Sequence, residues 1–152
     1  MSFKFKLSVG TILKLAASLL AIVAFFMMFA DQVKMGDGRL YIVFPFDEAV
    51  KEAGGIVVGY ILSLVAGLVL AFSTLFEFNN KKVGLIILIS GLVLLLVGTI
   101  LMFCTGAIFK GAVDARINVK LATGAIVGGI LGIVSLLCEG SAVLLQKFNV
   151  IK

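Results

Sequence analysis

The chain has 152 residues, of which 62% are hydrophobic and only 14% are charged. Because soluble domains are about half apolar and a quarter charged, this composition is typical of a protein that lies in a membrane. The net charge of +5 does not indicate a nucleic-acid partner, since the basic residues sit at the ends of apolar runs and form no stripe with interleaved aromatic residues. The length predicts a single domain, residues 1–152.

Four apolar runs are long enough to cross a bilayer, because about 20 helical residues span the hydrocarbon core. Backbone groups in lipid must be hydrogen-bonded within their own segment, so each run is predicted to be a helix. The sequence therefore predicts an all-α membrane protein, a bundle of four transmembrane helices. With flanking residues of helical spacing included, the expected helices cover about 12–30, 47–76, 83–110 and 119–146.

The first loop, residues 31–53, is predicted to contain a short β-hairpin. Its stretch "VKMGDGRLYIVFPF" has a Gly-Asp-Gly turn before a β-branched and aromatic run. Beyond it, acids precede a lysine at helical spacing in "DEAVKE", so the second helix is expected to begin near Asp47. In the loop 106–120, Lys110 and Asp114 lie four residues apart. This spacing fits an extension of the third helix, and a solvated loop is an equal alternative.

The distribution of lysines predicts the orientation in the membrane. Both tails and the short loop "NNKK" are basic, whereas six acids dilute the two longer loops. Because basic residues favour the cytoplasmic side, we expect an integral protein of the plasma membrane with both termini in the cytoplasm and the hairpin loop outside the cell.

Small residues recur along the last three predicted helices. Lipid gives helices no hydrophobic gain on association, so their packing depends on the close backbone approach that small residues permit. Steps of four or seven therefore predict packing faces, which meet helices of the same chain or of another protomer. The residues are Gly55, Gly59, Ser63, Gly67 and Ala71 in the second helix, Gly84, Gly91 and Gly98 in the third, and Gly124, Gly128 and Gly132 in the fourth.

One acid, Glu139, lies inside the fourth apolar run, eight residues before Lys147 and so about 12 Å in from that lysine. A charge at such depth costs on the order of 2.5 to 3.5 kcal/mol and needs a partner, water or a proton. Lys14 follows Lys6 by the same eight residues, so we predict an intramembrane ion pair between Lys14 and Glu139. Two alternatives stay open: Lys14 reaches the surface while Glu139 meets water or Ser135, or Glu139 couples to protons or cations.

Catalysis is not expected from this residue set. The chain has two cysteines, no histidine and no tryptophan, whereas metal sites and most hydrolytic or redox centres use histidine or paired cysteines. Cys104 and Cys138 fall at opposite depths, which excludes a disulfide between them. We therefore expect no enzyme activity, no metal and no other cofactor.

The layout of a long first outer loop, a short inner loop and internal termini resembles that of claudin-like tetraspan proteins. The resemblance covers topology alone, because the tryptophan and paired cysteines of the claudin first loop are absent, so no functional residue is carried over. Rotor proteolipids of rotary ATPases resemble the chain in size and in an acid in the last helix, but the sequence "LLCEGSAVLL" differs from theirs.

These features together predict a non-enzymatic tetraspan protein that acts as a structural or accessory subunit. Its expected partners are the lipid bilayer and either other membrane-protein subunits or further copies of itself in a homo-oligomer. The alternative function is a small oligomeric channel or transporter, in which Glu139 is a buried carboxylate linked to ions or protons.

The predicted topology can be tested by labelling single cysteines. Placed at positions 2 and 151, they should react with a membrane-impermeant thiol reagent from the same face of the membrane, because four spans return the chain to its starting side. Labelling of the two positions from opposite faces would rule out an even number of spans.

Overall fold

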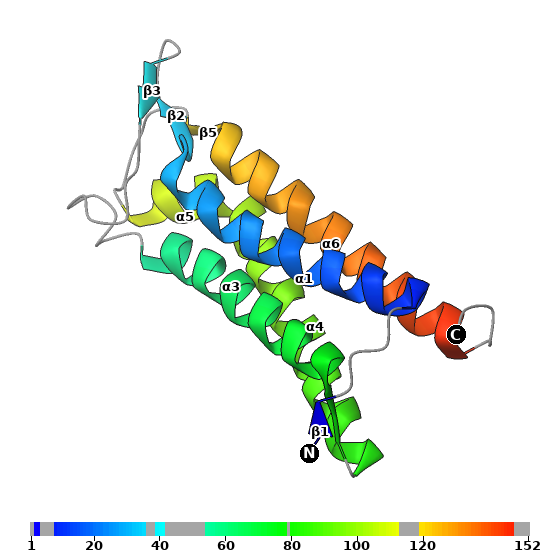
Figure 1. The fold of residues 1–152 in the computed structure, drawn as a ribbon. Coiled ribbons are helices and arrows are strands. Elements are labelled where there is room, and N and C mark those ends of the chain that lie inside the picture. Colours follow the sequence, from blue (N-terminus) through cyan, green and yellow to red (C-terminus); the bar gives the residue numbers. More distant parts are fainter. Residues whose placement is uncertain are drawn as a thin grey trace.

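The computed structural model describes residues 2–3, 8–35, 39–41, 54–78, 80–112 and 119–147. Four long helices form an up-and-down bundle in which α1 and α4 each pack against α3 and α6 (Figure 1). All four are long and apolar enough to cross a membrane, so the predicted four-helix architecture is confirmed. Their bounds are Val9–Phe26 for α1, Gly54–Leu75 for α3, Lys81–Phe103 for α4 and Thr123–Lys147 for α6.

Polar side chains mark where two of these helices begin. The first amide groups of a helix have no partner within it, and Ser, Thr, Asp or Asn side chains commonly accept from them. Ser8 Oγ accepts from the Thr11 amide at 3.2 Å before α1, and Asn80 Oδ1 accepts from the Lys82 amide at 3.0 Å before α4. The expected start of the second helix near Asp47 lies outside the described residues.

The third predicted helix is divided. After α4 a turn at Cys104 leads into a separate helix, α5 (Thr105–Ala112), so the helical extension into the loop exists but is not continuous with the membrane span. The two pieces stay closely joined, because the Ile108 amide donates to the Cys104 carbonyl at 2.9 Å.

A three-stranded sheet lies at one end of the bundle, here called the sheet end (Figure 1). The predicted hairpin strands are confirmed: β2 (Val33–Met35) pairs antiparallel with β3 (Arg39–Tyr41), while the expected Gly-Asp-Gly turn lies outside the described residues. The second edge of β2 pairs with β5 (Val119–Leu121). The expectation that residues 119–121 begin the fourth helix is therefore wrong, because their backbone groups satisfy the open edge of the hairpin.

The chain starts and ends at the opposite end of the bundle, here called the terminal end (Figure 1). A two-residue strand, β1 (Ser2–Phe3), pairs antiparallel with β4 (Phe76–Glu77), which directly follows α3. This pairing ties the residues before α1 to the connection between α3 and α4.

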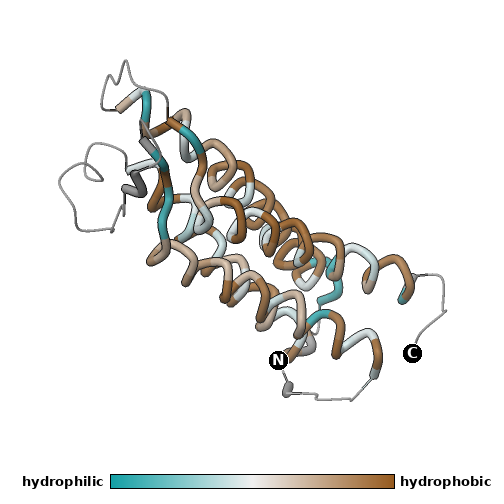
Figure 2. The backbone as a smooth tube through the Cα atoms, turned by 90° about the horizontal axis from the view of Figure 1, so that it is seen from above, coloured by the Kyte–Doolittle hydropathy of each residue, from teal (hydrophilic) through white to brown (hydrophobic). Residues whose placement is uncertain are grey.

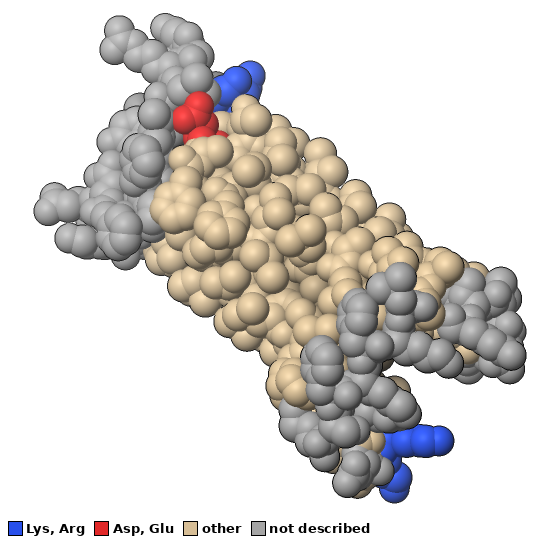
Figure 3. Space-filling model, in the orientation of Figure 1, with Lys and Arg blue, Asp and Glu red and all other residues tan. Residues whose placement is uncertain are grey.

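The outer surface of the bundle is apolar between its two ends. Hydrophobic residues dominate the four helices along their length (Figure 2), and in the view of Figure 3 the described charged side chains appear only at the two ends. Large apolar side chains such as Ile86, Leu19 and Leu137 are more than half exposed. A surface of this kind fits hydrocarbon and not water, so the protein is an integral membrane protein whose helices contact lipid.

A close helix crossing joins α3 to α4 at two glycines of the predicted stripes. A Cβ atom added to Gly98 would lie 2.8 Å from the carbonyl oxygen of Gly59, which is too close for any side chain. Farther along α3, a Cβ atom on Gly67 would lie 2.9 Å from the Ser18 carbonyl oxygen of α1. Between them, Ser63 donates a hydrogen bond of 2.9 Å to the Ala21 carbonyl of α1. One stripe of α3 thus packs against two different helices.

The other stripe residues also have neighbours within the same chain. Gly91 of α4 lies against Leu70, and Gly132 of α6 lies against Thr99 of α4. The remaining contacts are looser or lie near helix ends. They place Gly128 beside Tyr60 and Met102, Gly124 beside Gln32, Gly55 beside Ile108 and Gly84 beside Phe78, while Ala71 is half-buried.

The Gly59 and Gly98 crossing can be tested with a single methyl group. Gly98→Ala should lower the free energy of unfolding by about 1 to 3 kcal/mol, because the added carbon meets backbone atoms that cannot move aside. Denaturant unfolding in mild detergent, followed by circular dichroism, measures the change.

Gly140→Ala is the matched control, since no atom lies within 4 Å of a Cβ added at Gly140. This variant should unfold like the wild type or at slightly higher denaturant, because alanine favours the helix over glycine. Equal destabilisation by both substitutions would show that the crossing depends on something other than backbone contact.

Candidate functional site

The antiparallel contact between α1 and α6 places Lys14 and Glu139 at the same level of the bundle. On one side of them Ser135 Oγ of α6 donates to the Ala17 carbonyl of α1 at 2.6 Å. On the other side the Gln146 side chain lies against Gly10. Along α1, Lys14 lies between Gly10 and Ala17, and along α6, Glu139 lies between Ser135 and Gln146. The matching depths inferred from sequence therefore hold in the structure.

Glu139 is the anomalous residue of this region. Its side chain is 0% exposed, and neither carboxylate oxygen has a hydrogen-bond partner among the described residues. Lys14 lies at the same level of α1, but no hydrogen bond joins its ammonium group to the carboxylate, so the ion pair stays a prediction.

The hydroxyl groups nearest in sequence are used elsewhere. Ser135, one turn before Glu139, donates to the Ala17 carbonyl, and Ser18, one turn after Lys14, donates to the Lys14 carbonyl at 2.9 Å. Each serine has one proton to donate, so neither donates to Glu139 in this arrangement. The alternative in which Ser135 satisfies the acid is thus not realised.

A cleft of about 550 Å³ opens at the terminal end, and Lys14 forms part of its wall. Figures 1 and 2 show the α1 and α6 pair spreading away from the α3 and α4 pair toward this end. Both pairs contribute to the wall, so the cleft lies between them. Its described lining residues are Lys14, Ser73, Phe76, Phe78, Lys81, Gly84, Leu85, Leu88 and Gln146.

A second buried polar cluster, at the sheet end, was not identified from sequence. Tyr60 of α3 donates to Gln32 Oε1 at 2.5 Å, and Gln32 Nε2 donates to the carbonyls of Met27 (2.7 Å) and Ala30 (2.8 Å). Gly124 makes room for this amide. Every polar group of the Gln32 side chain has a partner, which indicates a structural role. A tyrosine inside a predicted span, which needs a hydroxyl partner, was the available signal.

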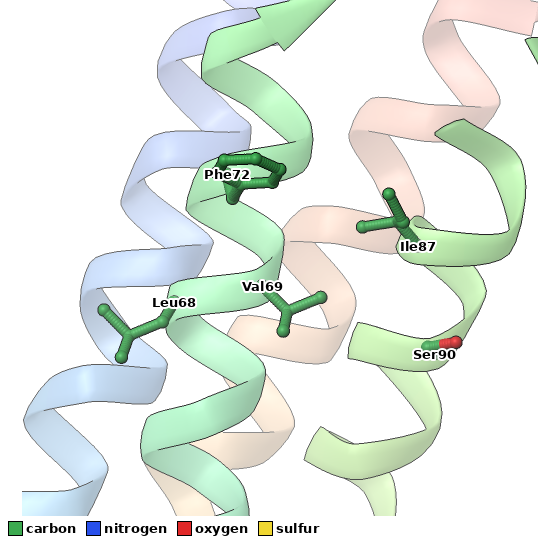
Figure 4. A pocket seen from close by; sticks show the side chains of 5 residues that line it. All are labelled: Leu68, Val69, Phe72, Ile87 and Ser90. Atoms are coloured by element: carbon green, nitrogen blue, oxygen red, sulfur yellow. The ribbon is translucent and has the colours of Figure 1, made fainter. Parts of the chain in front are cut away.

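The membrane-facing surface also has apolar grooves. One holds about 530 Å³ between α3 and α4, with Ser90 as the one polar residue among the five that line it (Figure 4). The others are Leu68, Val69, Phe72 and Ile87. A groove of this composition at hydrocarbon depth fits acyl chains and offers no groups for chemistry.

The described residues form neither a metal site nor a disulfide. No three His, Cys, Asp or Glu side chains gather among them, and Cys104 and Cys138 are both free thiols. In comparisons with protein families, curated proteins and solved structures, nothing matches this chain.

The relation between Lys14 and Glu139 can be measured with a double-mutant cycle in detergent. Lys14→Met and Glu139→Gln should each destabilise the bundle, because each leaves the other residue's charge uncompensated. The double variant should recover part of the loss, with a coupling of about 0.6 kcal/mol, the average for polar contacts in membranes.

Strictly additive losses would contradict a charge pair. A Glu139→Gln variant that is as stable as the wild type, beside a destabilised Lys14→Met variant, would show that the acid is already neutral.

Proposed function

We propose that this chain is a non-enzymatic subunit of a membrane assembly, a structural or accessory tetraspan protein in a complex or a homo-oligomer. The proposal rests on one observation, that the buried polar side chains of the bundle form hydrogen bonds within the chain. Apart from Glu139, the buried side-chain donors and acceptors of the described residues are satisfied. Ser63, Ser135 and Tyr60 reach across to other segments of the same chain. Such hydrogen bonds hold helices together, which supports a structural role for these described side chains.

The filled interior favours contact over transport. The glycine crossings bring α3 against both α4 and α1, and two clusters of buried apolar side chains occupy the space between the helices. A pathway for ions through one bundle would need a continuous polar lining, whereas these clusters are apolar. Their buried members are Ala24, Val33, Ile56, Tyr60, Met102 and Phe109 near the sheet end, and Ala21, Ala66, Leu70 and Leu95 nearer the middle.

The orientation belongs to the same proposal. Lys81 and Lys82 lie at the terminal end, and the sequence has further lysines before α1 and after α6. Cytoplasmic leaflets carry anionic lipids, and lysines at the ends of spans favour that side. We therefore place the terminal end in the cytoplasm and the sheet end outside, in the plasma membrane.

One observation favours a second candidate function. Glu139 is buried and its oxygens have no hydrogen-bond partner, and an intramembrane acid in this state commonly marks a proton or ion site. An oligomer of bundles that exposes Glu139 to a shared pathway would be an ion-linked channel or transporter. Ions would then move between protomers or through the cleft beside Lys14.

The state of assembly distinguishes the two candidates. Native mass spectrometry of protein extracted in mild detergent should show a stoichiometric second membrane protein, or a defined oligomer that carries no ion current in liposomes. Proton or cation flux that disappears in Glu139→Gln would favour the transport role over the accessory role. The matched control is Gly140→Ala, which is expected to fold like the wild type and should keep that flux.

A further inference from the structure

We propose that the cleft at the terminal end, together with the groove that continues it, binds one anionic phospholipid. The phosphate would lie between Lys14 and Lys81, and one acyl chain would follow the seam between α4 and α6 toward the middle of the membrane. The proposal goes beyond the accessory role and does not require Lys14 to pair with Glu139, because Lys81 remains in either case.

The lining of the cleft selects a negative group. Among its described lining residues two are lysines and none is acidic, and the lysines come from the two helix pairs that face each other across it. Lys81 is the first residue of α4, at the boundary of the span. Lys14 lies five residues into α1, about 8 Å deep, from where a long side chain can reach the headgroup region. Basic pockets between cytoplasmic helix ends are the usual sites for anionic headgroups.

A second, independent observation points to a lipid and not to a soluble anion. A groove of about 310 Å³ lies farther along the bundle, with α4 and α6 as its walls. On α4 the lining passes from Leu85 and Leu88 in the cleft to the next turns in the groove. The groove residues are Ile89, Leu92, Val93, Leu96, Leu136 and Gly140. A basic mouth that leads into an apolar channel matches an amphiphile.

The length of this path fits one acyl chain. From Leu85 to Leu96 the helix rises about 16 Å, close to the roughly 15 Å of one leaflet's hydrocarbon. Gly140 leaves the groove open on the α6 side, because no atom of another helix lies within 4 Å of a Cβ added there. This glycine differs from Gly98 and Gly67, which lie directly against a neighbouring helix.

The test uses the full chain purified in mild detergent, titrated with phosphatidylglycerol or with phosphatidylcholine of identical acyl chains and analysed by native mass spectrometry. The wild type should bind the anionic lipid more tightly with a stoichiometry of one. Lys81→Gln should reduce that affinity about fivefold, the value of one lysine near a charged lipid surface. Lys81→Arg should preserve it.

Two controls separate this site from general surface charge. Lys82→Gln removes the neighbouring lysine, which is exposed and does not line the cleft, and should leave the affinity unchanged. Gly140→Leu should weaken binding of both lipids, because the leucine side chain would fill the groove. The variant should still fold, since no atom of another helix lies within 4 Å of a Cβ added at this position. Should Gly140→Leu fail to fold, a phosphatidylglycerol with a photoreactive chain end should cross-link the wild type at α4 residues near Leu92 or Leu96.

Four outcomes would overturn the proposal. They are equal affinity of the wild type for both lipids, an equal loss in Lys82→Gln and Lys81→Gln, displacement of the lipid by glycerol phosphate at similar concentration, and cross-links that fall outside the α4 and α6 seam. The third outcome would identify a soluble-anion site. A fifth outcome, loss of an oligomer in Gly140→Leu with unchanged lipid binding, would also overturn the proposal by assigning the groove to a second copy of the chain, and it would support the proposed homo-oligomer. The first four outcomes do not bear on whether the protein is an accessory subunit.

Discussion

The close approach of α3 to α4 at Gly59 and Gly98 is the contact on which the rest of the bundle depends. Apolar side chains gain nothing by leaving lipid for the protein interior, so helices in a membrane associate through dispersion between close backbones and through hydrogen bonds. The two glycines supply the first, and the Ser63 hydrogen bond to Ala21 supplies the second on the adjoining face of α3. Large apolar residues can then face outward, which is why the exterior is as hydrophobic as the core.

The two ends of the bundle differ in how their backbone groups are hydrogen-bonded. The last carbonyls of a helix lack partners within it. At the sheet end, Gln32 donates to the Met27 and Ala30 carbonyls and accepts from Tyr60, and the three strands satisfy one another, so this end is closed. At the terminal end the helix pairs spread apart around a basic cleft, joined by the short pairing of β1 with β4. Among the described residues, hydrogen bonds therefore join the segments of the sheet end, whereas the terminal end has a basic cleft.

Sequence predicted those features that depend on local pattern. The four spans follow from run length, and the hairpin from its Gly-Asp-Gly turn. The pairing of β5 with β2 could not be predicted, because "VKL" borders an apolar run and becomes a strand only when a distant edge is available. The stripes indicated contact faces, but which helix each glycine meets depends on the three-dimensional crossing. The Tyr60 and Gln32 bond joins residues 28 apart, and only the packing of α3 against the end of α1 brings them together.

Lys14 connects the two unusual features of the terminal end. It is the cation at the level of the buried Glu139 carboxylate, and it also lines the cleft proposed for an anionic lipid. The nearby hydroxyls of Ser135 and Ser18 donate to α1 carbonyls, so Lys14, water or a proton must offset the cost of burying Glu139. A phosphate that draws Lys14 into the cleft would compete with the predicted ion pair for the same ammonium group. Because linkage is reciprocal, a Lys14 held by Glu139 would bind the lipid more weakly by the same factor.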